Sequence, residues 1–201
     1  QAFSGFQKGM SEVFTLMPTA SQSAFDAMNT DVKDFSMEFG VLPDKVIPGL
    51  YNALSSGVPA DNVFSFLEIA QKAATAGVTD LSVTVDGLTS VVNAYGSETI
   101  TAAQASDTMF AAVVFGKTTF EELSSTLYNV NPIAASLGVS FGDVTSAIAA
   151  MTAQGVPTAQ TTTQLRQMMV ELGDNTTAVG KQFKMLSGVG FKEFITSGGD
   201  V

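Results

Sequence analysis

The sequence contains no cysteine and no histidine, and Arg166 is its single arginine among 201 residues. Without cysteine and histidine, the chain cannot form disulfides, thiol nucleophiles, or metal sites made of thiolates or imidazoles. Catalytic dyads and triads that depend on histidine are ruled out for the same reason. These classes of site are therefore excluded within this chain.

Charged side chains are also scarce, at 14% of the residues, against about 25% in a typical soluble domain. Two interpretations of this low charge stay open. The outer faces of the protein meet copies of the chain or other subunits, or hydroxyl side chains rather than charges make the surface soluble in water. The formal net charge is −10, and the nine basic residues are scattered. Because nucleic-acid binding needs clustered Lys and Arg at the phosphates, we expect no direct binding to nucleic acid.

Long apolar runs are missing. The longest stretches, such as FAAVVF at residues 110–115, are far shorter than the roughly 20 residues of a membrane-spanning helix. No signal peptide is apparent, and the first residue is Gln rather than Met. We therefore expect a cleaved product or one piece of a longer chain. The 201 residues are enough for one large or two small domains.

Apolar residues recur at intervals of three and four, which places them on one face of a helix. Three such stripes stand out: Phe25, Met28, Val32, Phe35 and Phe39; Leu81, Val85, Leu88, Val92 and Tyr95; and Phe120, Leu123, Leu127, Val130, Ala134 and Leu137. The short alternation in LSVTV does not outweigh the second stripe. The sequence predicts an all-α fold of about nine to eleven short helices, packed as an irregular bundle or a partial α-solenoid.

Gly-Val pairs separate the predicted helices. They occur as GVLPD at Gly40, GVPAD at Gly57, GVTDL at Gly77, GVSFG at Gly138 and GVPTA at Gly155. Glycine adopts the left-handed conformation that ends a helix, and the next apolar residue folds back onto the last turn. Pro, Ser, Thr or Asp then begins the following helix.

Two further signals interrupt the helical pattern. GKTTFEELSS, from Gly116, has Thr118 and Glu121, or Thr119 and Glu122, at the spacing of a capping box. Pro132 lies inside the third stripe, where it predicts a kink or a break near Asn131.

Paired carboxylates are the first candidates for chemistry. Glu121 and Glu122 are adjacent, so on a helix they point about 100° apart rather than toward one bond, as the two acids of a glycosidase must. We interpret them as first-turn residues at the positive end of a helix. Asp31 and Asp34 flank Lys33, and we interpret them as a solvated helical face.

Loop motifs give weaker signals. DGLTS at Asp86 and GDNTT at Gly173 are similar to calcium loops, but they lack the alternating acidic ligands. The segment from Gly96 has no phosphate-loop pattern. We therefore predict no catalytic residue, no cofactor-binding residue and no metal ligand.

Arg166 lies beside Leu165 in a further helical stripe. Because an arginine stem can lie along apolar surface while its guanidinium reaches a carboxylate or a carbonyl, we expect a structural ion pair or a clamp at a helix joint. The nine methionines and fifteen phenylalanines mostly fall on apolar stripes, where they fill the core. Met169, beside Met168, is a candidate for contact with a partner helix.

Four segments, in this order, make the chain resemble the core region of phage tail tape-measure proteins: FGVLPDKVIPGLYNALSSGV, AQKAATAGVTDLSVTVDGLTSVVNAYG, AAQASDTMFAAVVFGKTTFEELSSTL and IAASLGVSFGDVTSAIAAMTAQGVPTAQTTTQLRQMM. The resemblance covers roughly residues 35–172. Its most telling points are Ser106-Asp107, Gly116-Lys117-Thr118-Thr119 and Gln154-Gly155-Val156-Pro157.

This resemblance implies a structural virion protein without enzymatic activity. Such chains are made in the host cytoplasm, fill the tail lumen in a few parallel copies, often three, and set the length of the tail. They leave the tube at DNA ejection and contact tail-tube and tail-tip proteins and, at ejection, the host envelope. The implied organisation is a helical lead-in at residues 1–34, a core at 35–173, and an extension at 174–201 that leads into the parent chain.

Two other functions stay open. One is a peptidoglycan-hydrolase segment of a tail protein, for which Glu68 and Glu98 are the remaining mid-chain glutamates to inspect. The other is a helical interaction module unrelated to phage.

Overall fold

The computed structural model describes residues 2–198, which form twelve α-helices, two short 3-10 helices and no strand. The all-α prediction is confirmed. The twelve α-helices exceed the predicted nine to eleven by at least one, and residues 178–196 contribute two of them. None of the helices in this range is both long and apolar enough to cross a bilayer.

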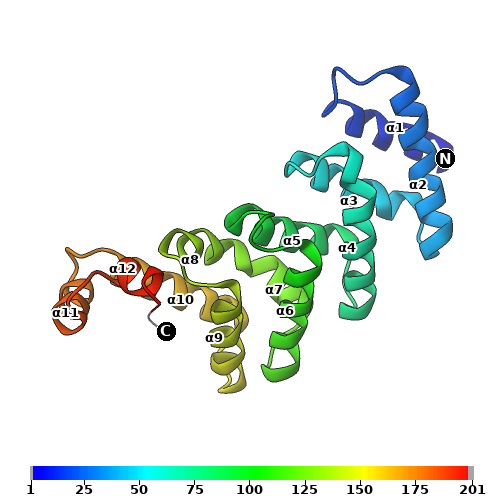
Figure 1. The fold of residues 1–201 in the computed structure, drawn as a ribbon. Helices are drawn as coiled ribbons and strands as arrows, with labels where there is room; N and C mark the ends of the chain where they lie inside the picture. The colour runs from blue at the N-terminus through cyan, green and yellow to red at the C-terminus, as the bar shows by residue number, and fades with distance from the viewer. Residues whose placement is uncertain (1, 199–201) are drawn as a thin grey trace. The chain divides into compact units, whose positions relative to one another are not determined.

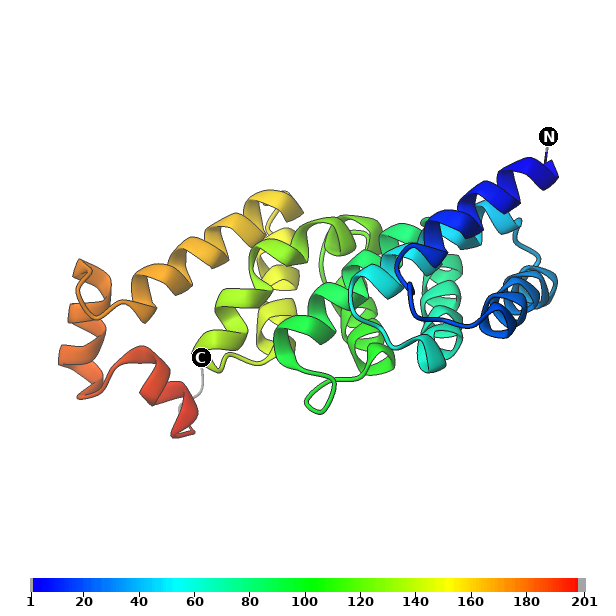
Figure 2. The ribbon, with the colours of Figure 1, turned by 90° about the horizontal axis from the view of Figure 1, so that it is seen from above.

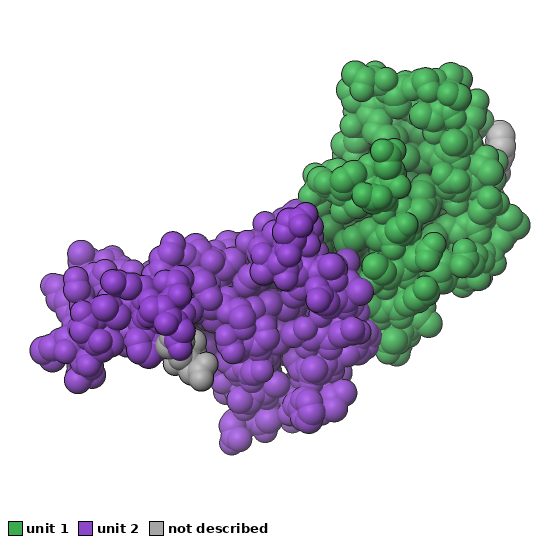
Figure 3. Space-filling view, viewed as in Figure 1, with its two compact units in different colours: residues 1–89 green, residues 90–201 purple. Residues whose placement is uncertain are grey.

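The chain forms two compact units, residues 1–89 and residues 90–201 (Figure 3). In the first unit, α3 packs against α1, α2 and α4 (Figure 1). The core between these helices is built from aliphatic side chains with almost no exposed area, such as Val46, Leu50 and Leu67. The helices of this unit are α1 (Ala2–Phe14), α2 (Gln22–Phe39), α3 (Pro43–Ser55), η1 (Ala60–Asn62), α4 (Val63–Gly77) and the start of α5 (Leu81–Tyr95).

The second unit is organised around α10, which contacts α7, α8, α9, α11 and α12. Figure 2 shows α10 as the long helix that leads into α11. A second close pair is formed by α6 and α9. The helices that follow α5 are α6 (Ala102–Phe115), α7 (Phe120–Thr126), η2 (Leu127–Asn129), α8 (Asn131–Leu137), α9 (Phe141–Ala153), α10 (Thr158–Gly173), α11 (Ala178–Ser187) and α12 (Phe191–Thr196).

The apolar stripes form the core. All six residues of the third stripe, from Phe120 to Leu137, are buried. The helical structure is interrupted within this stripe, since α7 and η2 end before α8 begins at Asn131. Pro132 lies in the first turn of α8. The prediction for Pro132 is confirmed. In the second stripe Leu81, Val85 and Leu88 are buried as predicted. At the next position of the stripe, Val91 is buried instead of Val92.

Four of the five Gly-Val joints have the predicted geometry. Gly40, Gly57, Gly138 and Gly155 all have positive φ, between 65° and 93°. The valine that follows each glycine donates its backbone N–H to a carbonyl in the last turn of the preceding helix, as Val139 does to Ala134 at 3.0 Å. These bonds pair carbonyl groups that the end of a helix leaves free.

The joint at Gly77 differs from the prediction. Gly77 is the last residue of α4, and Val78 takes the left-handed conformation with φ 52° and ψ 50°. Val78 is also 89% exposed instead of folding back onto the helix. A β-branched residue with positive φ is strained, because its Cβ lies close to the following carbonyl group.

The predicted domain boundaries meet the helices in different ways. The boundary at residues 34 and 35 falls inside α2, whereas the boundary at 173 and 174 coincides with the end of α10. The division into compact units is placed elsewhere, within α5. The assignment of a lead-in, a core and an extension stays a prediction about the family.

Replacing the strained valine should stabilise the protein. We expect Val78→Gly to raise the free energy of unfolding by about 1 kcal/mol, because the strain is relieved and no buried contact is lost. Urea denaturation followed by circular dichroism measures this change. The matched control is Val58→Gly, which makes the same substitution where φ is negative and should destabilise. Equal losses at both positions would contradict the assigned strain.

Candidate functional site

The structure brings together two joints that the sequence places about 40 residues apart. The hydroxyl oxygens of Thr118, in the loop before α7, and Thr158, at the start of α10, lie 2.8 Å apart. In the same loop, the backbone N–H of Lys117 donates to the hydroxyl of Thr152 in α9 at 3.1 Å. The GKTT segment therefore contacts Thr152 and Thr158, which flank the QGVP segment, and this polar contact links α7, α9 and α10.

Glu122 is the acceptor at the centre of this contact. Its Oε2 accepts from the backbone N–H of Thr119 at 3.1 Å and from the hydroxyls of Thr158 and Thr118 at 3.1 and 3.3 Å. The backbone N–H of Glu122 donates in return to the Thr119 hydroxyl. Of the two capping boxes that the sequence allowed, the structure forms the one made by Thr119 and Glu122. Glu121 is exposed on the same turn.

Gly116 lets α6 approach α9 at this contact. A methyl group at Gly116 would lie 2.6 Å from the Thr152 hydroxyl and 2.8 Å from both the Ala112 carbonyl oxygen and the Ala149 Cα. Real Cβ atoms do not tolerate such distances, so glycine is required here by space rather than by backbone angle. Glu122, Thr119 and Gly116 therefore each have a structural role in this joint: the first two cap α7, and the third allows the close approach of α6 and α9.

The acidic residues of the two loop motifs are engaged in local structure, and the loop interpretation of DGLTS was wrong, since Asp86 lies inside α5. The Asp86 carboxylate accepts a hydrogen bond from the Asn52 side chain at 2.9 Å. Burial raises the pKa of Asp86, and this hydrogen bond opposes the rise. Asp174 accepts from the backbone N–H and the hydroxyl of Thr176 at 2.8 and 2.7 Å, and these bonds lower its pKa. Within residues 2–198, no three carboxylates lie close enough together to hold a metal ion.

Tyr95 is a half-buried residue with a buried hydroxyl group, and the sequence did not single it out as functional. Its ring packs edge-on against Phe141, with centroids 5.7 Å apart. Burial raises the pKa of the Tyr95 hydroxyl, and the nearby Asp143 carboxylate adds to the rise. The group therefore stays a neutral phenol at any physiological pH, as a core residue would.

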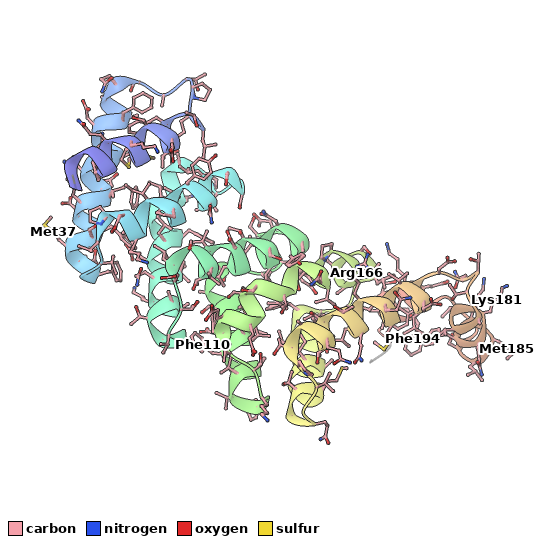
Figure 4. All side chains as sticks on the ribbon, turned by 180° about the vertical axis from the view of Figure 1, so that it is seen from behind. Met37, Phe110, Arg166, Lys181, Met185 and Phe194 are labelled. Carbon is pink, nitrogen blue, oxygen red and sulfur yellow. The ribbon has the colours of Figure 1, made fainter. Side chains whose placement is uncertain are left out.

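Arg166 lies on the exposed side of α10 (Figure 4). It lines a surface hollow of about 510 Å³ together with Tyr128, Pro132, Ile133 and Val170, beside the break between η2 and α8. Among the residues that the structure describes, ion pairs form between Lys45 and Asp80 and between Lys72 and Glu68. The ion-pair alternative for Arg166 is therefore wrong within this part of the chain, and the clamp at a helix joint stays a prediction.

The two adjacent methionines of α10 have opposite environments. Met169 is 4% exposed and belongs to the core, whereas Met168 is 43% exposed. The sequence assigned the partner contact to Met169, and this was wrong. Because neighbouring residues on a helix point about 100° apart, one of the pair is turned outward when the other is buried.

Asp31 and Asp34 line a hollow in the first unit that we call the acidic groove. Its volume is about 630 Å³, and it is formed by α2, η1, α4 and the loop between α1 and α2. Its carboxylates are those of Asp31, Asp34, Glu38, Asp61 and Glu68. Glu98, the other glutamate considered for hydrolysis, lies outside this hollow, in the turn before α6.

A second exposed surface lies on α11, and the sequence analysis did not find it. Lys181, Lys184 and Met185 are exposed and lie within about 100° of one another around this helix, and we call this side the basic face of α11 (Figure 4 labels Lys181 and Met185). Met185 is 76% exposed and Leu186 is 78% exposed. The sequence signal for this face was the spacing of three between Lys181 and Lys184, with Met185 directly after the second lysine.

Comparison with known proteins identifies the family. Residues 7–199 match the family described as Phage-related minor tail protein, which is nearly the whole chain. The chain belongs to this family. It is also similar to the probable tape measure protein of Clostridium phage phiCD119, with 31% identity over 203 residues. The resemblance to phage tail tape-measure proteins is thereby confirmed.

The chain corresponds to a part of that relative. The match covers 96% of this chain and 21% of the phiCD119 protein, so the chain spans about a fifth of the length of this curated relative. No solved structure matches the chain.

Removal of the central acceptor should weaken the joint. We expect Glu122→Ala to lower the free energy of unfolding by about 1–2 kcal/mol, because it removes a helix cap and the acceptor for Thr158. The control is Glu121→Ala, which alters an exposed neighbour and should change stability by less than about 0.5 kcal/mol. Both are measured by urea denaturation. Equal effects of the two substitutions would show that the contact contributes nothing.

Proposed function

We propose that the chain is a structural segment of a tail tape-measure protein. In this proposal it lies in the tail lumen, contributes to the assembly and length of the tail tube, and leaves ahead of or with the DNA at ejection. The observation that carries the proposal is the match of residues 7–199 to a minor tail protein family, together with the printed name of the phiCD119 relative.

A structural role without enzymatic activity is consistent with the places of the acidic side chains. Glu122 is committed to a helix cap, Asp86 and Asp174 to local hydrogen bonds, and Glu68 to an ion pair with Lys72 at 3.9 Å. A glycosidase needs two carboxyl groups that face one bond across a cleft. The alternative of a peptidoglycan-hydrolase segment is tested by a zymogram on cell-wall material, in which a cleared band would contradict the structural proposal.

The proposed partners are other copies of the chain, the tail tube and tail-tip proteins, with contact between the parent chain and the host envelope at ejection. Exposed apolar side chains support an assembly role, since Met37, Val114, Phe115 and Met185 are each more than 70% exposed. Apolar side chains that adjoin one another on the surface can mark contact sites, and Val114 and Phe115 are adjacent at the end of α6. A small closed assembly, such as a trimer of parallel copies, agrees with this surface.

In-frame deletion of residues 1–201 from the parent gene tests the role in tail length. A fully extended helix of this length would span roughly 300 Å at about 1.5 Å per residue. We expect electron micrographs to show tails shortened by up to that amount, or tails of normal length that have lost infectivity. The first result would mean that the segment is part of the ruler, and the second that it acts in assembly or ejection. Tails of normal length and full infectivity would contradict the proposal.

The net charge of −10 predicts weak contact with the DNA that shares the lumen. Like charges repel, and the chain lacks the clustered cations that replace counterions at phosphates. We expect no measurable binding in a titration of the protein into labelled duplex DNA at about 20 mM salt, where electrostatic attraction is least screened. Tight binding under these conditions would contradict this part of the proposal.

A further inference from the structure

Two surfaces, one in each unit, combine charge of a single sign with apolar side chains, and their charges are opposite. The acidic groove belongs to the first unit, and the basic face of α11 belongs to the second. Complementary charge on two exposed surfaces favours their association, and it fixes which surface meets which.

The acidic groove has an apolar floor under its carboxylates. Met28 and Phe35, both buried, come from α2, and half-buried Phe64 comes from α4. No lysine or arginine lines the groove. Lys72, on α4, pairs with Glu68 alone, and Lys33, on α2, lies over the ring of Phe6, 5.5 Å from its centroid. Four of the five carboxylates therefore have no ion-pair partner among the described residues.

The carboxylates do not form a metal site. No three acidic side chains in residues 2–198 lie close enough together to share a metal ion. Carboxylates spread around an apolar floor suit a partner whose cations are also spread out, as they are along a helix.

The basic face of α11 has this pattern. The other side of the helix is fixed in place: Gly180 is buried against the carbonyl of Asp174, and the ring of Phe183 packs edge-on against Phe191 and Phe194, with centroids 5.3 and 5.5 Å apart. Packing on this side holds the opposite side outward.

Two cations and one large apolar side chain lie on the basic face. Lys181 and Lys184 are about one turn apart, and Met185 follows Lys181 at the next position on the same face (Figure 4 labels Lys181 and Met185). Residues 178–196 carry three lysines against a single glutamate, in a chain whose net charge is −10. This is the segment that an acidic groove would select from the chain.

We propose that α11 of one copy docks in the acidic groove of a second copy. The ammonium groups of Lys181 and Lys184 meet the groove carboxylates, and Met185 covers the apolar floor. This inference rests on the self-association in the proposed function and specifies its contact. Because the two surfaces differ, the contact is heterologous, so copies join head to tail and close into a ring or continue as a filament.

Charge reversal in the full chain tests the contact. We expect the wild-type chain to self-associate with rising concentration in sedimentation equilibrium. Lys181→Glu with Lys184→Glu, and separately Asp31→Lys with Asp34→Lys, should each weaken the association constant by about tenfold or more, because like charges then face each other. All four substitutions in one chain restore opposite charges and the wild-type net charge, and should recover the association.

The matched control is Lys8→Glu with Lys117→Glu, which changes net charge by the same amount at exposed positions outside both surfaces and should leave association unchanged. If circular dichroism shows that a charge-reversed variant does not fold, the variant Lys181→Gln with Lys184→Gln is used in its place. Association of the wild type should also weaken in 1 M NaCl, where the screening length falls to about 3 Å.

A wild-type chain that stays monomeric up to millimolar concentration would overturn the contact, as would association that the reversals do not change. Binding of monomeric wild-type chain to anionic phospholipid vesicles, lost in Lys181→Glu with Lys184→Glu, would assign α11 to a membrane surface and would overturn it too. The tail-length experiment is independent of these results, so the contact and the proposed function fail separately.

Discussion

The need to end helices at short intervals is the constraint on which the rest of this structure depends. Each helix leaves up to four backbone N–H groups and four carbonyl groups without partners at its ends. Hydroxyl side chains satisfy the starts, as Thr101, Thr119 and Thr177 do, and left-handed glycines satisfy the ends, as Gly138 and Gly188 do. A chain of many short helices therefore needs many threonines, serines and glycines, whereas it needs few charges.

Hydroxyl groups also enter the core. Thr89, Thr145 and Thr152 are buried, and each donates its hydroxyl to the backbone carbonyl one turn earlier in its own helix. A polar group that is paired within its helix is buried at little cost. The two explanations for scarce charge, contact surfaces and solvation by hydroxyls, both concern the surface. The buried threonines add a third, because they occupy core positions without bringing charge.

The sequence predicts what local rules decide. The third stripe, the break at Pro132 and four Gly-Val joints follow from helical period and backbone stereochemistry, which depend on neighbouring residues. Packing between distant segments decides the rest. Which of Met168 and Met169 is buried depends on how α10 turns toward its neighbours, and the bond between Thr118 and Thr158 joins two loops that no local pattern connects. The exposure of the basic face of α11 likewise depends on where Phe183 finds its partners.

Helices in each unit pack against partners that lie at most a few helices away along the chain, as α3 does against α1 and α4 and α10 against α7 and α11. Contacts between segments close in sequence lose little chain entropy when they form, and folds built from them form quickly. Because the units are compact by themselves, we expect each to fold from contacts within its own residues. A chain unfolded by force would then recover one unit at a time.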